Sequence, residues 1–191
     1  MEKQIDFYFD VVSPYSYIAS TLIDNILERN NAKLIWKPIL LGGVFKSIEG
    51  VIAPGLVPVK KPYLIKDLER LSTFYNIPFN MPSDFPIRTL LAMRVLSSLP
   101  QEKIPQSARI LFEAYWSDNK DIADPDIVSK LIDSDSVERS NIKEIKDILF
   151  QSTEEAVERG VFGAPTFFVG NEMFFGHDRI NMIDEHLQGK I

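Results

Sequence analysis

The stretch QIDFYFDVVSPYSY, residues 4–17, decides the fold of this chain. Its apolar residues recur at every second position as far as Val11, which predicts a β-strand over Gln4–Val11. Ser13 followed by Pro14 is typical of a helix start, because serine caps free N–H groups and proline suits the first helical position. The stretch therefore predicts a strand that runs directly into a helix.

The residues that follow complete a strand–helix–strand unit. Helical spacing of apolar residues continues from Ile18 to Leu27, and Asn30 and Asn31 end that pattern. The short apolar segment Leu34–Leu41 predicts a second strand. Two strands joined by a helix within about 40 residues should be parallel.

Three further segments organise the rest of the chain. Glycines and prolines crowd residues 42–62 and predict a loop. Residues 62–160 carry apolar stripes at helical spacing and predict an all-helical insertion. Two short apolar runs around the turn at Gly170 and Asn171 predict a hairpin, and a last helix capped by Asp178 follows. The predicted class is α/β, in the order βαβ, helical insertion, ββα.

Composition limits the possible functions. The 191 residues are 45% hydrophobic, which suits one large domain or a domain with an insertion. Lys and Arg number 21 against 27 Asp and Glu, and the net charge of −6 disfavours nucleic acid and anionic lipid as partners. Because the chain has no cysteine, it has no thiol for redox chemistry or metal binding, and no metal site is predicted. No membrane span or secretory signal is visible, so we expect a soluble, cytoplasmic protein.

The turn Ser13–Ser16 lies where α/β folds place ligands, at the carboxyl end of a strand and the start of a helix. The predicted element order, with Pro165 before the third strand, resembles the thioredoxin fold carrying a helical insertion. This resemblance implies a thioredoxin-like domain over residues 1–61 and 161–191 and a helical insertion domain over residues 62–160. Redox members of that fold have two cysteines in this turn, whereas serines stand at both positions here.

Four segments narrow the resemblance to one family. They are FYFDVVSPYSY at residues 7–17, PGLVPVK at 54–60, GAPT at 163–166 and FGHDR at 175–179. In this order they resemble the family of kappa-class glutathione transferases and 2-hydroxychromene-2-carboxylate isomerases, whose fold is DsbA-like. The resemblance implies a homodimeric enzyme that uses glutathione and acts on a small electrophilic, aromatic substrate.

The resemblance gives the central role to Ser13, as hydrogen-bond donor to the glutathione thiolate. A free thiol has a pKa of about 8.5, and lowering it by about two units takes about 2.7 kcal/mol. One hydrogen bond to a charged group supplies about 1.5–3 kcal/mol, and a helix N-terminus adds about 0.3–1 kcal/mol. A serine at a helix start is therefore sufficient. The alternative is that Ser13 only caps the helix, and a role as nucleophile lacks a positioned base.

The resemblance assigns three further glutathione contacts near this turn. Tyr15 lies beside the thiolate, Ala164 binds the cysteinyl part through its main chain before a cis Pro165, and Lys60 meets a carboxylate. The residues alone leave other roles open. Pro165 is equally consistent with an ordinary proline at a strand start, and Lys60 with a solvated loop lysine.

The segment around His177 and Asp178 supplies the remaining contacts that the resemblance implies. Free N–H groups at this helix start form an anion site for the γ-glutamyl carboxylate, and Asp178 can also meet the γ-glutamyl ammonium. His177 stands where family members commonly carry Ser or Asn. We expect it to be a surface hydrogen-bonding residue rather than an acid–base catalyst.

Two departures from the family pattern leave the substrate open. Pro54 and Gly55 occupy the place of an Asn-Arg pair that holds substrate in the isomerases, and Val51 replaces an asparagine that helps kappa transferases hold glutathione. The reaction is a transfer if the glutathione adduct leaves, and an isomerisation if the adduct rearranges and expels glutathione. A further alternative is a non-catalytic thioredoxin-like module that binds a peptide or glutathione.

Overall fold

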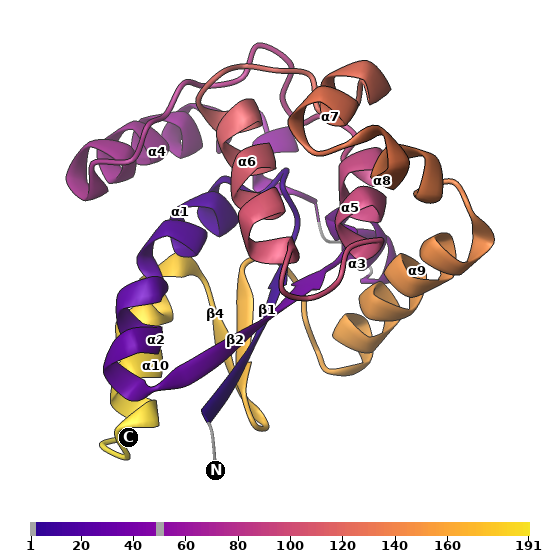
Figure 1. The fold of residues 1–191 in the computed structure, drawn as a ribbon. Helices are drawn as coiled ribbons and strands as arrows, with labels where there is room; N and C mark the ends of the chain where they lie inside the picture. The colour runs from indigo at the N-terminus through magenta and orange to yellow at the C-terminus, as the bar shows by residue number, and fades with distance from the viewer. Residues whose placement is uncertain (1–2, 49–51) are drawn as a thin grey trace.

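The computed structural model describes residues 3–48 and 52–191 and shows a four-stranded sheet with helices on both faces (Figure 1). The strands lie in the order β2 (Ala32–Pro38), β1 (Lys3–Phe9), β3 (Thr166–Val169) and β4 (Glu172–Phe175). β1 pairs in parallel with β2 and antiparallel with β3, which pairs antiparallel with β4. The predicted parallel unit and hairpin are confirmed, although β1 and β2 end earlier than expected.

Helices α1 (Pro14–Leu22) and α2 (Asp24–Asn30) connect β1 to β2. They replace the single predicted helix, which is interrupted at Ile23. Helix α10 (Ile180–Leu187) packs beside α2 at the same side of the sheet (Figure 1).

Between β2 and β3, the described residues form helices and turns. These elements are α3 (Leu41–Ser47), the 3-10 turn η1 (Pro54–Leu56), α4 (Lys61–Tyr75), α5 (Leu90–Ser97), α6 (Ile104–Trp116), α7 (Pro125–Leu131), α8 (Ser134–Arg139) and α9 (Lys143–Glu158). The expectation of a loop over residues 42–62 is therefore wrong where α3 and η1 lie.

Helix α3 forms because contacts distant in sequence override its two glycines. The Asp10 carboxylate accepts a hydrogen bond from the Leu41 N–H at 2.8 Å and so satisfies the start of the helix. A Cβ atom at Gly43 would lie 3.1 Å from the Thr153 methyl group of α9. Gly43 thus allows close packing of α3 on α9.

Two hydrophobic clusters cover the two faces of the sheet. Phe7 and Phe9 belong to the larger cluster, which extends into α1, α5 and α6 and includes Phe112. Tyr8, which points to the opposite face, belongs to a smaller cluster with side chains of α3 and α9. The larger cluster anchors the helical segment beside the end of β1. The division into two domains at residues 61 and 161 stays a prediction.

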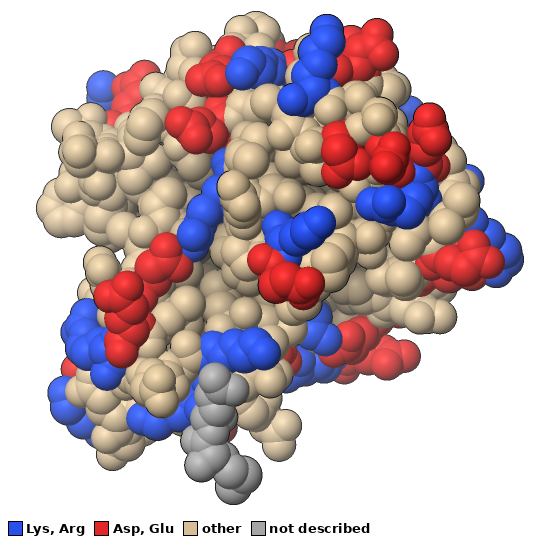
Figure 2. Space-filling model, viewed as in Figure 1, with Lys and Arg blue, Asp and Glu red and all other residues tan. Residues whose placement is uncertain are grey.

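The surface carries charges of both signs. On the face shown in Figure 2, acidic and basic side chains are intermingled rather than gathered in a single-sign area. Within residues 3–48 and 52–191, no helix combines the length and the apolar character that a membrane crossing requires.

Candidate active site

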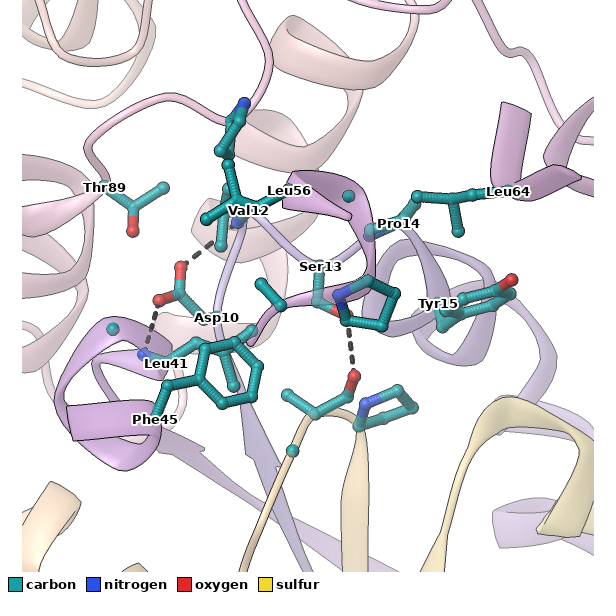
Figure 3. A pocket seen from close by; sticks show the side chains of 18 of the residues that line it. Asp10, Val12, Ser13, Pro14, Tyr15, Leu41, Phe45, Leu56, Leu64 and Thr89 are labelled. Carbon is teal, nitrogen blue, oxygen red and sulfur yellow. Dashed lines mark hydrogen bonds between the residues drawn. The ribbon is translucent and has the colours of Figure 1, made fainter. Parts of the chain in front are cut away.

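A cavity of about 910 Å³ lies at the carboxyl end of β1. Its lining comes from residues 10–15, 40–45, 52–56, 85–90, 162–165 and 175–178, together with Leu64 and Asp67 of α4. Figure 3 shows Ser13 and Tyr15 at the start of α1 and Leu41 and Phe45 of α3 around this cavity. The volume lies in the upper part of the range of small-molecule sites, about 300–1,000 Å³. Of the predicted site residues, only Lys60 is not part of the lining.

Ser13 lies at the start of α1, and it is buried, with 4% of its surface exposed. Its Oγ atom accepts a hydrogen bond from the Ser16 N–H at 3.2 Å, which confirms the predicted cap. The same hydroxyl donates to the main-chain oxygen of Ala164 at 2.7 Å (Figure 3). Ser13 therefore joins a helix start to the segment before β3. The Ser16 hydroxyl is buried as well, and no described residue is its hydrogen-bond partner.

The peptide bond between Ala164 and Pro165 is cis, as predicted. Ala164 is 8% exposed, and the Pro165 carbonyl accepts a hydrogen bond from the Gly176 N–H at 2.9 Å. This bond holds the segment before β3 beside the turn that follows β4. Main-chain groups of two segments thus lie within the same wall of the cavity.

Tyr15 links three elements of the site. Its ring stacks on the His177 ring with 5.1 Å between centroids and 9° between planes, and its hydroxyl donates to Asp67 at 3.0 Å. Burial, together with the bond to Asp67, raises the pKa of Tyr15, so the phenol stays protonated at neutral pH. Burial also lowers the pKa of His177, despite the carboxylates of Asp178 and Asp67. The sequence analysis did not select Asp67 as a site residue. Its neighbour on α4, Leu68, is buried, which agrees with a position of Asp67 near the core.

The start of the last helix differs from the prediction. His177–Arg179 form a 3-10 turn, η2, and α10 begins only at Ile180, so the expectation that Asp178 caps this helix is wrong. Asp178 instead accepts a hydrogen bond from the Arg179 guanidinium at 2.6 Å, and its side chain is 57% exposed. Gly176 has a φ of 101°, and a Cβ there would lie 2.5 Å from an Asp178 oxygen. The turn before η2 therefore needs glycine.

Asp10 is a second residue that the sequence analysis did not select. Its carboxylate is fully buried in the cavity wall and accepts hydrogen bonds from the N–H groups of Val12 at 3.1 Å and Leu41 at 2.8 Å (Figure 3). Burial raises the pKa of Asp10, and the donors, including the Thr89 hydroxyl, only partly oppose it. The signal in the sequence was a carboxylate at the end of an apolar strand.

Two loop predictions stand apart from the cavity. Lys60 is exposed at the start of α4, while the preceding segment of its motif, Pro54–Leu56, does line the cavity. The predicted replacement at Val51 lies outside the described residues. Arg88 is the only lysine or arginine in the described lining. No group of three or more His, Asp or Glu side chains in the described part of the chain is arranged to hold a metal ion.

Comparison with known proteins identifies relatives of this chain. Residues 4–188 match the family described as a DSBA-like thioredoxin domain. Glutathione S-transferase kappa 1 of Caenorhabditis elegans is 32% identical over 206 residues, covering 97% of this chain and 91% of the relative. A 2-hydroxychromene-2-carboxylate isomerase of Pseudomonas sp. (strain C18) is 30% identical over 196 residues, covering 97% and 90%. A solved structure of 2-hydroxychromene-2-carboxylate isomerase superposes with a TM-score of 0.86 at 27% identity, covering 97% and 95%.

The fold is thus a DsbA-like thioredoxin fold. The chain belongs to the enzyme family of kappa-class glutathione transferases and 2-hydroxychromene-2-carboxylate isomerases. The resemblance expected from the four sequence segments is confirmed.

Proposed function

We propose that this protein is a glutathione-dependent enzyme in which Ser13 stabilises the thiolate of bound glutathione. The thiolate attacks an electrophilic, aromatic substrate, which is then released as an adduct or isomerised. The observation that carries this proposal is the position of the Ser13 hydroxyl, which lies in the cavity wall at the start of α1, 2.7 Å from Ala164 O. One side chain can therefore reach both a sulfur atom and the main chain that would align a peptide.

In the proposed complex, the tripeptide lies extended along Ala164 and Pro165, with its main chain paired to the protein. The cysteinyl sulfur then lies at Ser13 and the helix N-terminus, which favour the charged form of the thiol. The γ-glutamyl end extends toward His177 and Asp178. Tyr15 supports this end, since it stacks on His177 and is held by Asp67.

The apolar part of the cavity is suited to the electrophile. Leu41, Phe45, Phe85 and Leu90 line it. In the reaction, the thiol first loses its proton to solvent. The thiolate then forms a carbon–sulfur bond with the substrate, and either a π bond of the substrate opens, with its electron pair moving onto the substrate, or a leaving group departs with the electron pair. A transferase releases the conjugate, whereas an isomerase allows rotation within the adduct and then breaks the same bond to return glutathione. The two named relatives, a transferase and an isomerase, support both outcomes equally.

A titration of thiolate absorbance for bound glutathione tests the proposal. We expect the pKa of the bound thiol to lie about two units below that of free glutathione in the wild type, and to return toward the free value in Ser13→Ala. Turnover of an electrophile should fall in parallel. An undisplaced pKa in the wild type contradicts the proposal.

One observation favours a second candidate, a glutathione-binding module without catalysis. The single hydrogen of the Ser13 hydroxyl is already donated to Ala164 O. If that bond persists in the complex, glutathione binds and its thiol pKa stays at the free value. The same titration separates the two functions.

We include in the proposal a homodimer, which the family resemblance supports, and a location in the cytoplasm. Light scattering of the purified protein and fractionation of the source cells test these two points.

A further inference from the structure

We infer that glutathione itself frees the Ser13 hydroxyl for its task, through an exchange of hydrogen-bond donors at the Ala164 carbonyl oxygen. This inference rests on the proposed function and deepens it. It makes a main-chain carbonyl group the determinant of which thiols are activated.

The hydrogen bonds around Ser13 pose the problem that the exchange solves. In the structure, Ser13 Oγ accepts from Ser16 N–H at 3.2 Å and donates to Ala164 O at 2.7 Å. A hydroxyl group has only one hydrogen, so this oxygen has no further donor to offer a thiolate. An anion placed beside it would face lone pairs and be repelled. Activation therefore requires the hydroxyl to leave Ala164 O.

Leaving that carbonyl without a donor is unfavourable, because both groups are buried, with 4% of Ser13 and 8% of Ala164 exposed. A replacement donor must come from the ligand. A peptide aligned along this segment presents such a donor, since the amide N–H of its cysteinyl residue pairs with main-chain carbonyls. Once this N–H occupies Ala164 O, the hydroxyl is free to turn.

The movement needed is small and conserves every hydrogen bond. The Ser13 hydrogen rotates about the Cβ–Oγ bond from Ala164 O toward the sulfur, while Oγ continues to accept from Ser16 N–H. No proton passes between ligand and protein, and the thiol proton leaves to solvent. Thiols that bind without a cysteinyl amide N–H should have their pKa lowered less, because nothing displaces Ser13 from the carbonyl.

The exchange is tested with two ligands and two proteins. The ligands are glutathione and its ester analogue, in which oxygen replaces the amide N–H between the γ-glutamyl and cysteinyl residues. The proteins are the wild type and Ser13→Ala, each saturated with ligand and titrated by thiolate absorbance. Each bound pKa is compared with that of the same ligand free in solution, because the ester alters the thiol's own acidity.

We expect the wild type to lower the pKa of bound glutathione by about two units. It should lower the pKa of the ester analogue by at least about one unit less, which is a difference of at least about tenfold in the ratio of thiolate to thiol. In Ser13→Ala, the two ligands should show equal displacements. Ser16→Ala is the matched control, since it removes a buried hydroxyl from the same helix that has no partner among the described residues. It should behave like the wild type.

The outcomes separate this inference from the proposed function. If the wild type lowers both pKa values equally, the exchange is overturned and thiolate activation stands. If the ligands still differ by the full amount in Ser13→Ala, the amide acts on the thiol directly and the exchange is again overturned. If glutathione itself is not displaced in the wild type, the proposed function fails and the exchange fails with it.

Discussion

Of the helix starts that border the cavity, those of α1 and of η2 with α10 are built in different ways. At α1, Ser13 accepts from the Ser16 N–H, and Pro14 occupies the first helical position. At the other start, the chain makes the 3-10 turn η2 before α10, and neither element has a side-chain cap. The sequence signal was similar at both places, a capping residue shortly after a strand.

The difference follows from the residues beside each candidate cap. Pro14 fixes its own φ in the helical range, so Ser13 must be the last extended residue. Asp178 has no such neighbour, and Gly176 at a φ of 101° turns the chain two residues earlier. Asp178 therefore lies inside the turn, where its carboxylate meets Arg179. A capping residue is decisive only where its neighbours fix the backbone.

The two starts also suit different tasks. Ser13 is buried, where a hydrogen bond to a charge is worth most, whereas Asp178 is more than half exposed and solvent screens it. We therefore expect chemistry to depend on the first start and binding on the second. The predictions below test that division.

The largest effect is expected from Ser13→Ala. Loss of the hydroxyl removes a bond to the thiolate that the neutral thiol makes only weakly, so the bound pKa should rise by about 1–2 units. Turnover near neutral pH should then fall about 10- to 100-fold, while glutathione affinity below the bound pKa barely changes. Thiolate absorbance and initial rates measure both.

The fold should survive this substitution. Loss of the cap costs about 1 kcal/mol, and the unpaired Ala164 carbonyl costs about 1–3 kcal/mol, against a typical stability of about 5–15 kcal/mol. Circular dichroism during urea unfolding checks this. A variant that titrates like the wild type assigns thiol activation to another group.

The comparison also explains which features the sequence could predict. Local patterns were sufficient for β1, the capped start of α1 and the β3–β4 hairpin, because each depends on neighbouring residues. Helix α3 was missed because its start is satisfied by Asp10, 31 residues away. The link between Tyr15 and Asp67 spans 52 residues and leaves no local signal either. Site residues joined by distant segments came from the family resemblance, and their roles stay predictions.

Asp10→Asn should disturb the hydrogen bonds that the Asp10 carboxylate accepts next to the start of α1. The amide keeps an acceptor for Val12 N–H but can present its NH2 group to Leu41 N–H, so we expect the unfolding free energy at pH 7 to change by about 1–3 kcal/mol. Asp178→Asn is the matched control at the exposed start and should change it much less. Urea unfolding of both variants measures the difference.

The pH dependence of the unfolding free energy tests the protonation of Asp10. Its folded pKa is raised above the ordinary value of 3.8, so the folded protein holds this proton more tightly than the unfolded chain. The contribution of Asp10 to the stability of the wild type is therefore complete below pH 3.8, the ordinary pKa of this group, and is lost as pH rises through the folded pKa. Asp10→Asn should lack this loss. His177, whose lowered pKa acts in the opposite sense below about pH 6.5, is present in both proteins and cancels in their difference. Parallel pH profiles for the two proteins contradict the assignment.

A smaller, purely binding effect is expected from Asp178→Asn. An exposed carboxylate that meets the γ-glutamyl ammonium contributes about 0.2–1 kcal/mol, so KM for glutathione should rise by up to about fivefold. The pKa of the bound thiol should not change, because Asp178 contacts the other end of the proposed ligand. A large change in that pKa would show that the two helix starts do not divide the work as proposed. Initial rates over a glutathione series, together with the absorbance titration, decide this.

The smallest effect is expected from Lys60→Ala. Lys60 lies at the start of α4, which has no side-chain cap, and it is outside the described cavity lining. A lysine that reaches a glutathione carboxylate from such a position acts through solvent, so its loss should weaken binding about two- to threefold at low salt and leave the bound thiol pKa unchanged. Near 0.5 M salt, screening should remove most of that difference.

Lys66→Ala is the control, since Lys66 is also exposed on α4 and pairs with Glu69 at 3.1 Å. Isothermal titration of glutathione into the three proteins at both salt concentrations measures the effect. Equal affinities for the wild type and Lys60→Ala at low salt would show that Lys60 is a solvated lysine. A loss of affinity that persists at high salt would show that Lys60 contacts the ligand directly, and that the start of α4 moves toward the site when glutathione binds.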